Sequence, residues 1–154
     1  MMLKELLIDS GALLEGKHWR RQRFHVNEVI VREGARCGNV FVLLEGRVQV
    51  TGTLILAARK IRPGYQVLEA GEVFGELALL DDGPHVASVV GVTDGIVAVI
   101  PLDVLRDWLE NHPEAAVRFY RHLARILSGR LRRTNAKMLS VLGWGLKARG
   151  YESL

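Results

Sequence analysis

Short β-rich runs, most of them closed by a glycine or by Pro-Gly, fill most of the chain from about residue 27 to residue 100. Strand-sized pieces punctuated every 8 to 12 residues or so are typical of antiparallel sandwiches and rolls. Thr93-Asp94-Gly95, between the last two runs, is a hairpin turn signal. The runs are EVIVREG, NVFVLLEG, RVQVTG, TLILAARKIRPG, YQVLEAGE, HVASVVGV and GIVAVIP. The sequence therefore predicts a mainly β fold with some α, an antiparallel β-roll (double-stranded jelly roll) over residues 27–100.

Helical segments flank the predicted roll. Residues 1–26 read as short helical turns followed by the basic run KHWRRQR. Pro101 ends the β region, and Pro113 suits the first turn of a long second helix. Gly143 and Gly145 are expected to end that helix. The expected organisation is an N-terminal segment 1–26, a roll 27–100, C-terminal helices 101–142 and a tail 143–154.

An apolar stripe runs along the long helix with spacings of three and four. Such a stripe, sustained over this length, favours a seam to a second copy of the chain, hence a homodimer through residues 114–142. The alternative is that the stripe packs on the roll. Its members are Ala116, Phe119, Leu123, Ile126, Leu127, Leu131, Met138 and Val141, with Thr134 in register.

The positive charge is concentrated in the same helix. The chain has a net charge of +4, and residues 118–137 contain seven cations and no acid. We expect a solvated helix face, with nonspecific contact to nucleic acid or to an acidic partner as the alternatives. A helix-turn-helix unit would need about 60 further residues after the long helix, so sequence-specific DNA binding is not expected.

The N-terminus and the cysteine content point to the cytoplasm. Lys4, Glu5 and Asp9 interrupt the first apolar residues, which argues against a signal peptide. No apolar run approaches the roughly 20 residues that a membrane span needs. Cys37 is the single cysteine and cannot form an internal disulfide. A reducing cytoplasm is the expected location, with no contact to a membrane.

The order of these elements resembles a known family. VIVREG, VFVLLEGRVQV and AGEVFGELALLDDGP, followed by a GPH-x-A-S-V strand and two helices, are similar to the cyclic-nucleotide-binding domain of the catabolite-activator and protein-kinase-A regulatory type. The resemblance covers roughly Phe24 to Arg133. It implies that residues 71–89 contain a phosphate-binding cassette, running from Gly75 to Ser88.

The resemblance gives roles to the first part of this segment. Gly75 lets the backbone approach a ligand closely. Glu76 falls where the family has a glutamate that bonds a ribose hydroxyl. The amides of Leu77 and Ala78, at the start of a short helix, could face a phosphate. Without the family pattern, the simpler interpretation is that Gly75 makes a turn and Glu76 caps the helix.

The second part departs from the family pattern. Binding members have an arginine where His85 stands and a small hydroxyl or alanine where Val86 stands. A guanidinium donates to two phosphate oxygens and stays charged. A histidine offers one donor and, with a pKa near 6.5, is only about a quarter protonated at neutral pH. His85 is either a substitute phosphate ligand or a residue of the pocket wall, and Ser88 meets either the base or only its strand.

Other chemistry has little support in the sequence. His18, His25, His85, His112 and His122 are scattered singly, so no metal site is expected. No G-x-S-x-G motif is present, and the protein is not expected to be an enzyme. The leading prediction is a regulatory or sensor domain without an output domain and without a cofactor, binding cAMP or cGMP weakly. The alternatives are a dimerisation or protein-interaction module without a ligand, and a sensor of another anionic small molecule.

Overall fold

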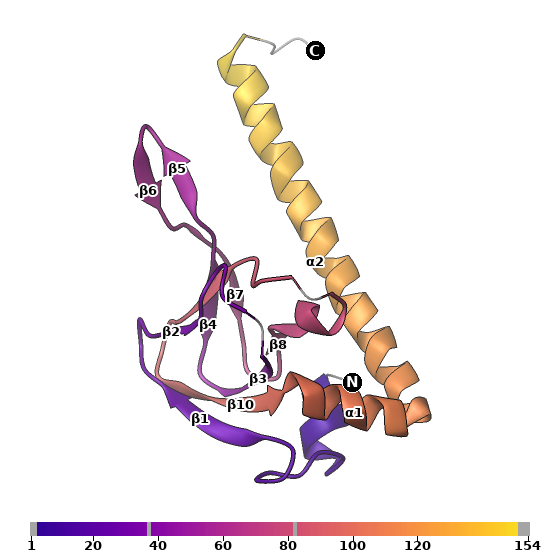
Figure 1. The fold of residues 1–154 in the computed structure, drawn as a ribbon. Coiled ribbons are helices and arrows are strands. Elements are labelled where there is room, and N and C mark those ends of the chain that lie inside the picture. The colour runs from indigo at the N-terminus through magenta and orange to yellow at the C-terminus, as the bar shows by residue number, and fades with distance from the viewer. Residues whose placement is uncertain (1–2, 37, 82, 151–154) are drawn as a thin grey trace. The chain divides into compact units, whose positions relative to one another are not determined.

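The computed structural model describes residues 3–36, 38–81 and 83–150, and the chain divides into two units, Met1–Ala116 and Val117–Leu154. The first unit contains all of the described strands (Figure 1). The second consists of the greater part of one long helix.

Two four-stranded antiparallel sheets form the roll. The first has the order β1-β10-β3-β8 and the second has the order β2-β9-β4-β7. The strands of the first sheet are β1 (Arg20–Phe24), β10 (Gly95–Pro101), β3 (Asn39–Glu45) and β8 (Val73–Phe74). Those of the second are β2 (Val29–Val31), β9 (Ser88–Gly91), β4 (Val48–Thr51) and β7 (Gly64–Leu68). The predicted antiparallel β-roll is confirmed.

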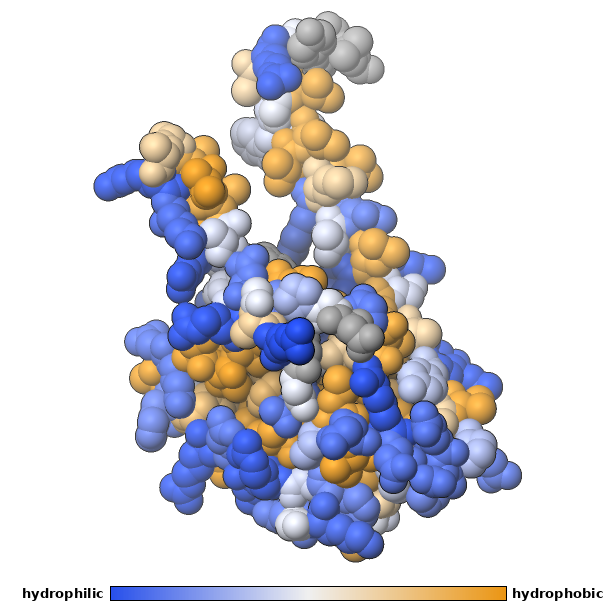
Figure 2. Space-filling view, viewed as in Figure 1, coloured by the Kyte–Doolittle hydropathy of each residue, from blue (hydrophilic) through white to orange (hydrophobic). Residues whose placement is uncertain are grey.

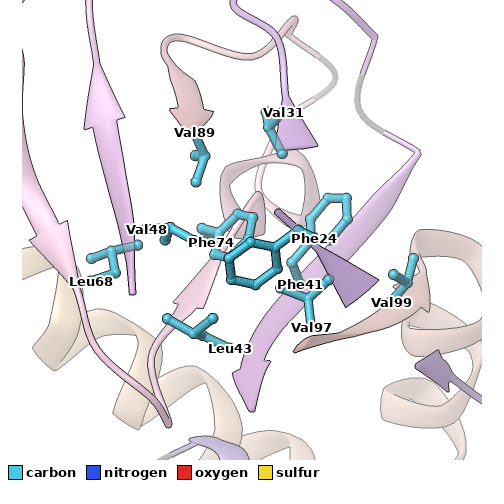
Figure 3. Packing of buried hydrophobic residues seen from close by; sticks show 10 residues of the cluster. All are labelled: Phe24, Val31, Phe41, Leu43, Val48, Leu68, Phe74, Val89, Val97 and Val99. Carbon is cyan, nitrogen blue, oxygen red and sulfur yellow. The ribbon is translucent and has the colours of Figure 1, made fainter. Parts of the chain in front are cut away.

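The hydrophobic core lies between the inner faces of the two sheets (Figure 3). Every strand of both sheets contributes at least one side chain to it, because inward positions alternate with outward ones along a strand. Phe41 and Phe74 stack in its middle with ring centroids 5.0 Å apart. Each large apolar side chain stabilises the fold by about 1.5–3 kcal/mol when fully buried. The members are Phe24, Val31, Phe41, Leu43, Val48, Leu68, Phe74, Val89, Val97 and Val99.

Two sequence predictions about the roll are wrong in detail. The roll begins before residue 27, because β1 (Arg20–Phe24) lies in the basic segment and pairs with β10. This strand lies at a sheet edge, where exposed cations are common. Its many basic residues gave no apolar strand pattern, so the sequence did not indicate a strand here. Thr93-Asp94-Gly95 does not close a hairpin either: β9 pairs with β2 and β4, while β10 pairs with β1 and β3. The turn instead carries the chain from one sheet to the other.

A separate hairpin replaces what the sequence shows as one run, TLILAARKIRPG. Strands β5 (Leu54–Leu56) and β6 (Arg59–Ile61) pair with each other and form a two-stranded sheet (Figure 1). Ala57 and Ala58 make the turn with φ of 50° and 62°, a conformation that glycine or asparagine normally supplies. The hairpin exposes several apolar side chains, seen in orange in Figure 2.

The helices are η1 (Glu5–Asp9), η2 (Glu76–Leu79), α1 (Leu102–Asn111) and α2 (Pro113–Ala148). Pro113 is the first residue of α2, as predicted. The predicted end of α2 at residue 142, with a tail from 143, is wrong, because the helix continues through Gly143 and Gly145. A helical glycine costs only about 1 kcal/mol. The helix ends before Gly150, whose φ of 85° is left-handed. Within the described ranges, no helix is long and apolar enough to cross a membrane.

Candidate functional site

A left-handed glycine opens the predicted cassette. Gly75 follows β8 with φ of 76° and precedes the first residue of η2. A Cβ at this position would lie 3.0 Å from the carbonyl oxygen of Asn39 and 3.3 Å from the ring of Phe41. Glycine is therefore required both by the backbone conformation and by the close approach of β3. Glu76 follows directly, and only 2% of its surface is exposed.

The short helix η2 is held by a side chain from α1. Arg106 donates a hydrogen bond from Nη2 to the carbonyl oxygen of Ala78, at 2.6 Å. Leu77 and Ala78, whose amides the sequence analysis proposed as phosphate donors, lie in the first turn of η2. A helix of four residues has few aligned peptide dipoles, so η2 alone contributes little positive potential. Any strong attraction for an anion here must come from side chains.

His85 is fastened to the turn that connects β2 to β3. Its backbone N–H donates to the carbonyl oxygen of Ala35 at 3.0 Å, and its carbonyl oxygen accepts from the N–H of Gly34 at 2.8 Å. The N–H of Ala35 donates to the carbonyl oxygen of Arg32, which closes a turn in which Gly34 has φ of 82°. A type II turn needs a positive φ at this position, so Gly34 is well suited to it.

A hollow of about 290 Å³ lies beside this turn. His85 lines it together with Arg32 and Arg36, which flank the turn on either side. Asn39 and Phe41 of β3, the two residues that Gly75 approaches, line it as well. The hollow therefore reaches His85 directly, and it shares with Gly75 only the neighbouring residues Asn39 and Phe41.

Partial burial lowers the pKa of His85 below its ordinary value of 6.5, because desolvation disfavours the charged imidazolium. The imidazole is thus more fully neutral at pH 7 than a solvated histidine would be. Arginine at this position would keep its charge under the same burial.

Of the seven predicted site residues, His85 alone lines this hollow. The other six are Gly75, Glu76, Leu77, Ala78, Val86 and Ser88. Val86 is 70% exposed. Ser88 is buried, and its Oγ accepts a hydrogen bond from the backbone N–H of Glu33 at 2.9 Å. This bond joins Ser88 to the segment that follows β2, the strand that pairs with β9. Ser88 also borders a second hollow of about 320 Å³, which Gln49, Thr51 and Arg62 help to line.

Sequence reasoning missed Arg32, Arg36 and Asn39 as neighbours of His85. The one available signal was a pair of arginines four residues apart around a glycine turn, and nothing in it indicates which distant segment the turn meets. Arg106 was missed for the same reason. Among the described residues, no three His, Cys, Asp or Glu side chains gather closely enough to hold a metal ion.

Comparison with known proteins finds matches that cover the roll and α1. The sequence profile of the cyclic nucleotide-binding domain matches residues 21–112. The chain is 25% identical over 123 residues to a CRP-like cAMP-activated global transcriptional regulator of Mycobacterium tuberculosis, a match that covers 77% of the chain and 50% of that regulator. It is 32% identical over 139 residues to glutaminase 2 of Bradyrhizobium diazoefficiens, covering 89% of the chain and 20% of that protein.

A solved structure gives the same result for the fold. The Thermus thermophilus catabolite activator protein superposes with a TM-score of 0.66 at 25% identity, covering 81% of this chain and 55% of that one. The chain thus spans about half the length of the two regulators and a fifth of the glutaminase. The likeness is to one region of each protein and not to the whole.

Proposed function

The chain belongs to the cyclic nucleotide-binding domain family, and from that premise we propose that it is a regulatory or sensor domain whose ligand site is the segment 71–89. The observation that carries the proposal is the junction of Gly75 and Glu76. A left-handed glycine with no room for a side chain is followed by a buried carboxylate at the start of η2. A turn that served only to reverse the chain would not need to bury an acid.

The proposed affinity for cAMP or cGMP is weak. Losing a desolvated charge-assisted contact costs about 2–5 kcal/mol, which is between about 30-fold and several thousand-fold in affinity. Partial burial makes His85 a poorer substitute still, since it lowers the pKa of the imidazole. A site that would have a micromolar dissociation constant with arginine at this position would have a millimolar or weaker one with His85. His85 and Val86 are therefore the residues that set the affinity.

We propose that the domain acts by binding and not by catalysis, in the cytoplasm and without a cofactor. The names of two relatives support the first point, because one is a cAMP-activated transcriptional regulator and the other is a catabolite activator protein. Glutaminase 2 is named as an enzyme, but the chain covers only 20% of it. Cys37 as the single cysteine supports the second.

A homodimer through α2 is the second part of the proposal. The helix has 36 residues and is about 54 Å long. Leu131, Met138 and Val141 recur on it at near-heptad spacing and are 61%, 53% and 69% exposed. An exposed apolar stripe of this length is unfavourable in water, and a second copy of the helix would cover it.

Calorimetry of the full chain tests the ligand proposal. Cyclic AMP, cyclic GMP and cyclic di-GMP are titrated into the wild type and into His85→Arg. Binding that is weak in the wild type and at least tenfold tighter in His85→Arg is the expected result. Tight binding by the wild type would overturn the proposed weakness. Absence of binding in both would favour the alternative, a protein-interaction module that keeps the roll and the apolar face of α2 without a small ligand.

A further inference from the structure

The hollow beside the β2–β3 turn is lined by positively charged side chains. Arg32 and Arg36 both line it, and none of the other described residues that line it is acidic. Both arginines are exposed and come from a segment far from residues 71–89 in the sequence. Two fixed cations beside one hollow repel each other, and a bound anion relieves that repulsion.

The one acid in the turn is directed elsewhere. Glu33 lies between Arg32 and Gly34, and its Oε2 accepts a hydrogen bond from Oγ1 of Thr53 at 2.7 Å. It does not line the hollow. The positive potential of the two arginines is therefore not cancelled from within the turn.

The turn is also held in place. The two backbone hydrogen bonds between His85 and residues 34–35 tie it to the cassette, and the bond from Ala35 to Arg32 closes it. Asn39 adds an amide, and Phe41 adds an apolar wall. A volume of about 290 Å³ is near the lower end of the range for small-molecule sites, about 300 Å³. The hollow suits a small ligand or the phosphorylated end of a larger one.

We infer that this hollow binds a small ligand through a terminal phosphate monoester, and that Arg32 and Arg36 supply the guanidinium groups that the cassette lacks at His85. The charge balance favours a monoester over a cyclic phosphate. A monoester carries about −1.5 to −2 near pH 7 and matches two cations, whereas a cyclic diester carries one negative charge. Three terminal oxygens can also accept from two guanidinium forks at once. This inference rests on the proposal that the cassette region receives a small anionic ligand.

The test follows backbone amides by ¹H–¹⁵N NMR in the full chain. The wild type is titrated with inorganic phosphate, 5′-AMP and cyclic AMP, and the amides of Gly34, Ala35 and His85 are monitored. We expect 5′-AMP and phosphate to shift these signals, with cyclic AMP binding more weakly. Removing both guanidinium groups in Arg32→Gln/Arg36→Gln should weaken 5′-AMP binding by at least about tenfold.

Two further variants separate the site from a general effect of charge. Arg47→Gln/Arg59→Gln removes the same net charge from exposed positions outside the hollow and should leave binding unchanged. Arg32→Lys/Arg36→Lys keeps the charge without the planar fork and should give an intermediate affinity, which also guards against a glutamine variant that fails to fold.

Several outcomes would overturn the inference without touching the proposed function. These are equal weakening in the two glutamine pairs, no shift at residues 34–35 and 85, or cyclic AMP binding tighter than 5′-AMP. If cyclic nucleotides bind and the affinity does not depend on Arg32 and Arg36, the sensor proposal stands and the inference fails. If 5′-AMP binds through the two arginines and no cyclic nucleotide binds in any variant, the inference stands and the cyclic-nucleotide proposal fails.

Discussion

Arg106 of α1 and Ala78 of η2 are joined by a hydrogen bond of 2.6 Å from the guanidinium Nη2 to the carbonyl oxygen. This contact ties the short helix of the cassette to the first helix after the roll. It also satisfies a carbonyl of a helix too short to satisfy all of its own groups. The position of the candidate site thus depends on α1 as well as on the strands that precede it.

Removing this bond should loosen η2. Arg106→Met keeps the aliphatic part of the side chain and is expected to lower the free energy of unfolding by about 1.5–3 kcal/mol, the range for a hydrogen bond to a charged group. Urea denaturation measures the change. Arg59→Met, on the exposed β5–β6 hairpin, is the control and should change stability by less than about 0.5 kcal/mol. Equal midpoints for wild type and Arg106→Met would show that the contact contributes nothing.

Gly75 and Gly143 should respond in opposite directions to alanine. Gly75→Ala forces a side chain into a left-handed backbone beside the carbonyl of Asn39, and should destabilise the protein by at least about 1–2 kcal/mol. Gly143→Ala lies in the interior of α2, where the new methyl group meets nothing within 4 Å beyond the neighbouring residues and the helix's own backbone, and it should stabilise the protein by up to about 1 kcal/mol. Thermal unfolding distinguishes the two signs. Destabilisation by Gly143→Ala would argue against a continuous α2.

The stability of the protein should depend on pH through His85. Its pKa is lowered by burial in the folded chain, so the unfolded chain takes up this proton at higher pH. Between the two pKa values the unfolded state holds more protons, so the free energy of unfolding falls as the pH drops through 6.5 toward the lower pKa of the folded state.

His85→Gln should therefore lose less stability between pH 7.5 and pH 5.5 than the wild type does. Denaturation of both proteins at the two pH values gives the comparison. The same loss in wild type and variant would mean that other groups set the pH dependence.

The dimer can be tested at one exposed position of α2. Leu131→Glu places a charge on the exposed apolar stripe and should shift the protein from dimer to monomer in sedimentation. Ser140→Glu makes the same change of charge at an exposed position about half a turn away around the helix and should stay dimeric. Leu123, on the same stripe in the sequence, is 1% exposed, so a charge there would test folding instead. A wild type that is already monomeric would end the dimer proposal.

The turn at Gly75 and the short helix after it were predictable from sequence because their requirements are local. Gly75 needs freedom at φ, and Glu76 and η2 follow it directly in the chain. The place of Arg32 and Arg36 was not predictable in this way. They line a hollow with His85 only because two backbone hydrogen bonds clamp their turn to it.

Turns likewise have a local part, which the sequence predicts, and a tertiary part, which it does not. Thr93-Asp94-Gly95 was recognised as a turn, but the pairing inferred from it was wrong, since β9 and β10 belong to different sheets. Ala57 and Ala58 were not recognised as a turn, because alanine has no preference for the left-handed conformation that they adopt. A turn signal reports a change of direction, and pairing is decided by which sheet can bury the next strand.

The sequence by itself determined the antiparallel roll, the helical C-terminal part and the turn at Gly75. Backbone sterics and the period of apolar residues act between near neighbours and are legible in the chain. Only the tertiary structure decided which strands pair and which cations stand beside His85. Those contacts join residues far apart in the sequence, and they form because the two sheets close over one shared core.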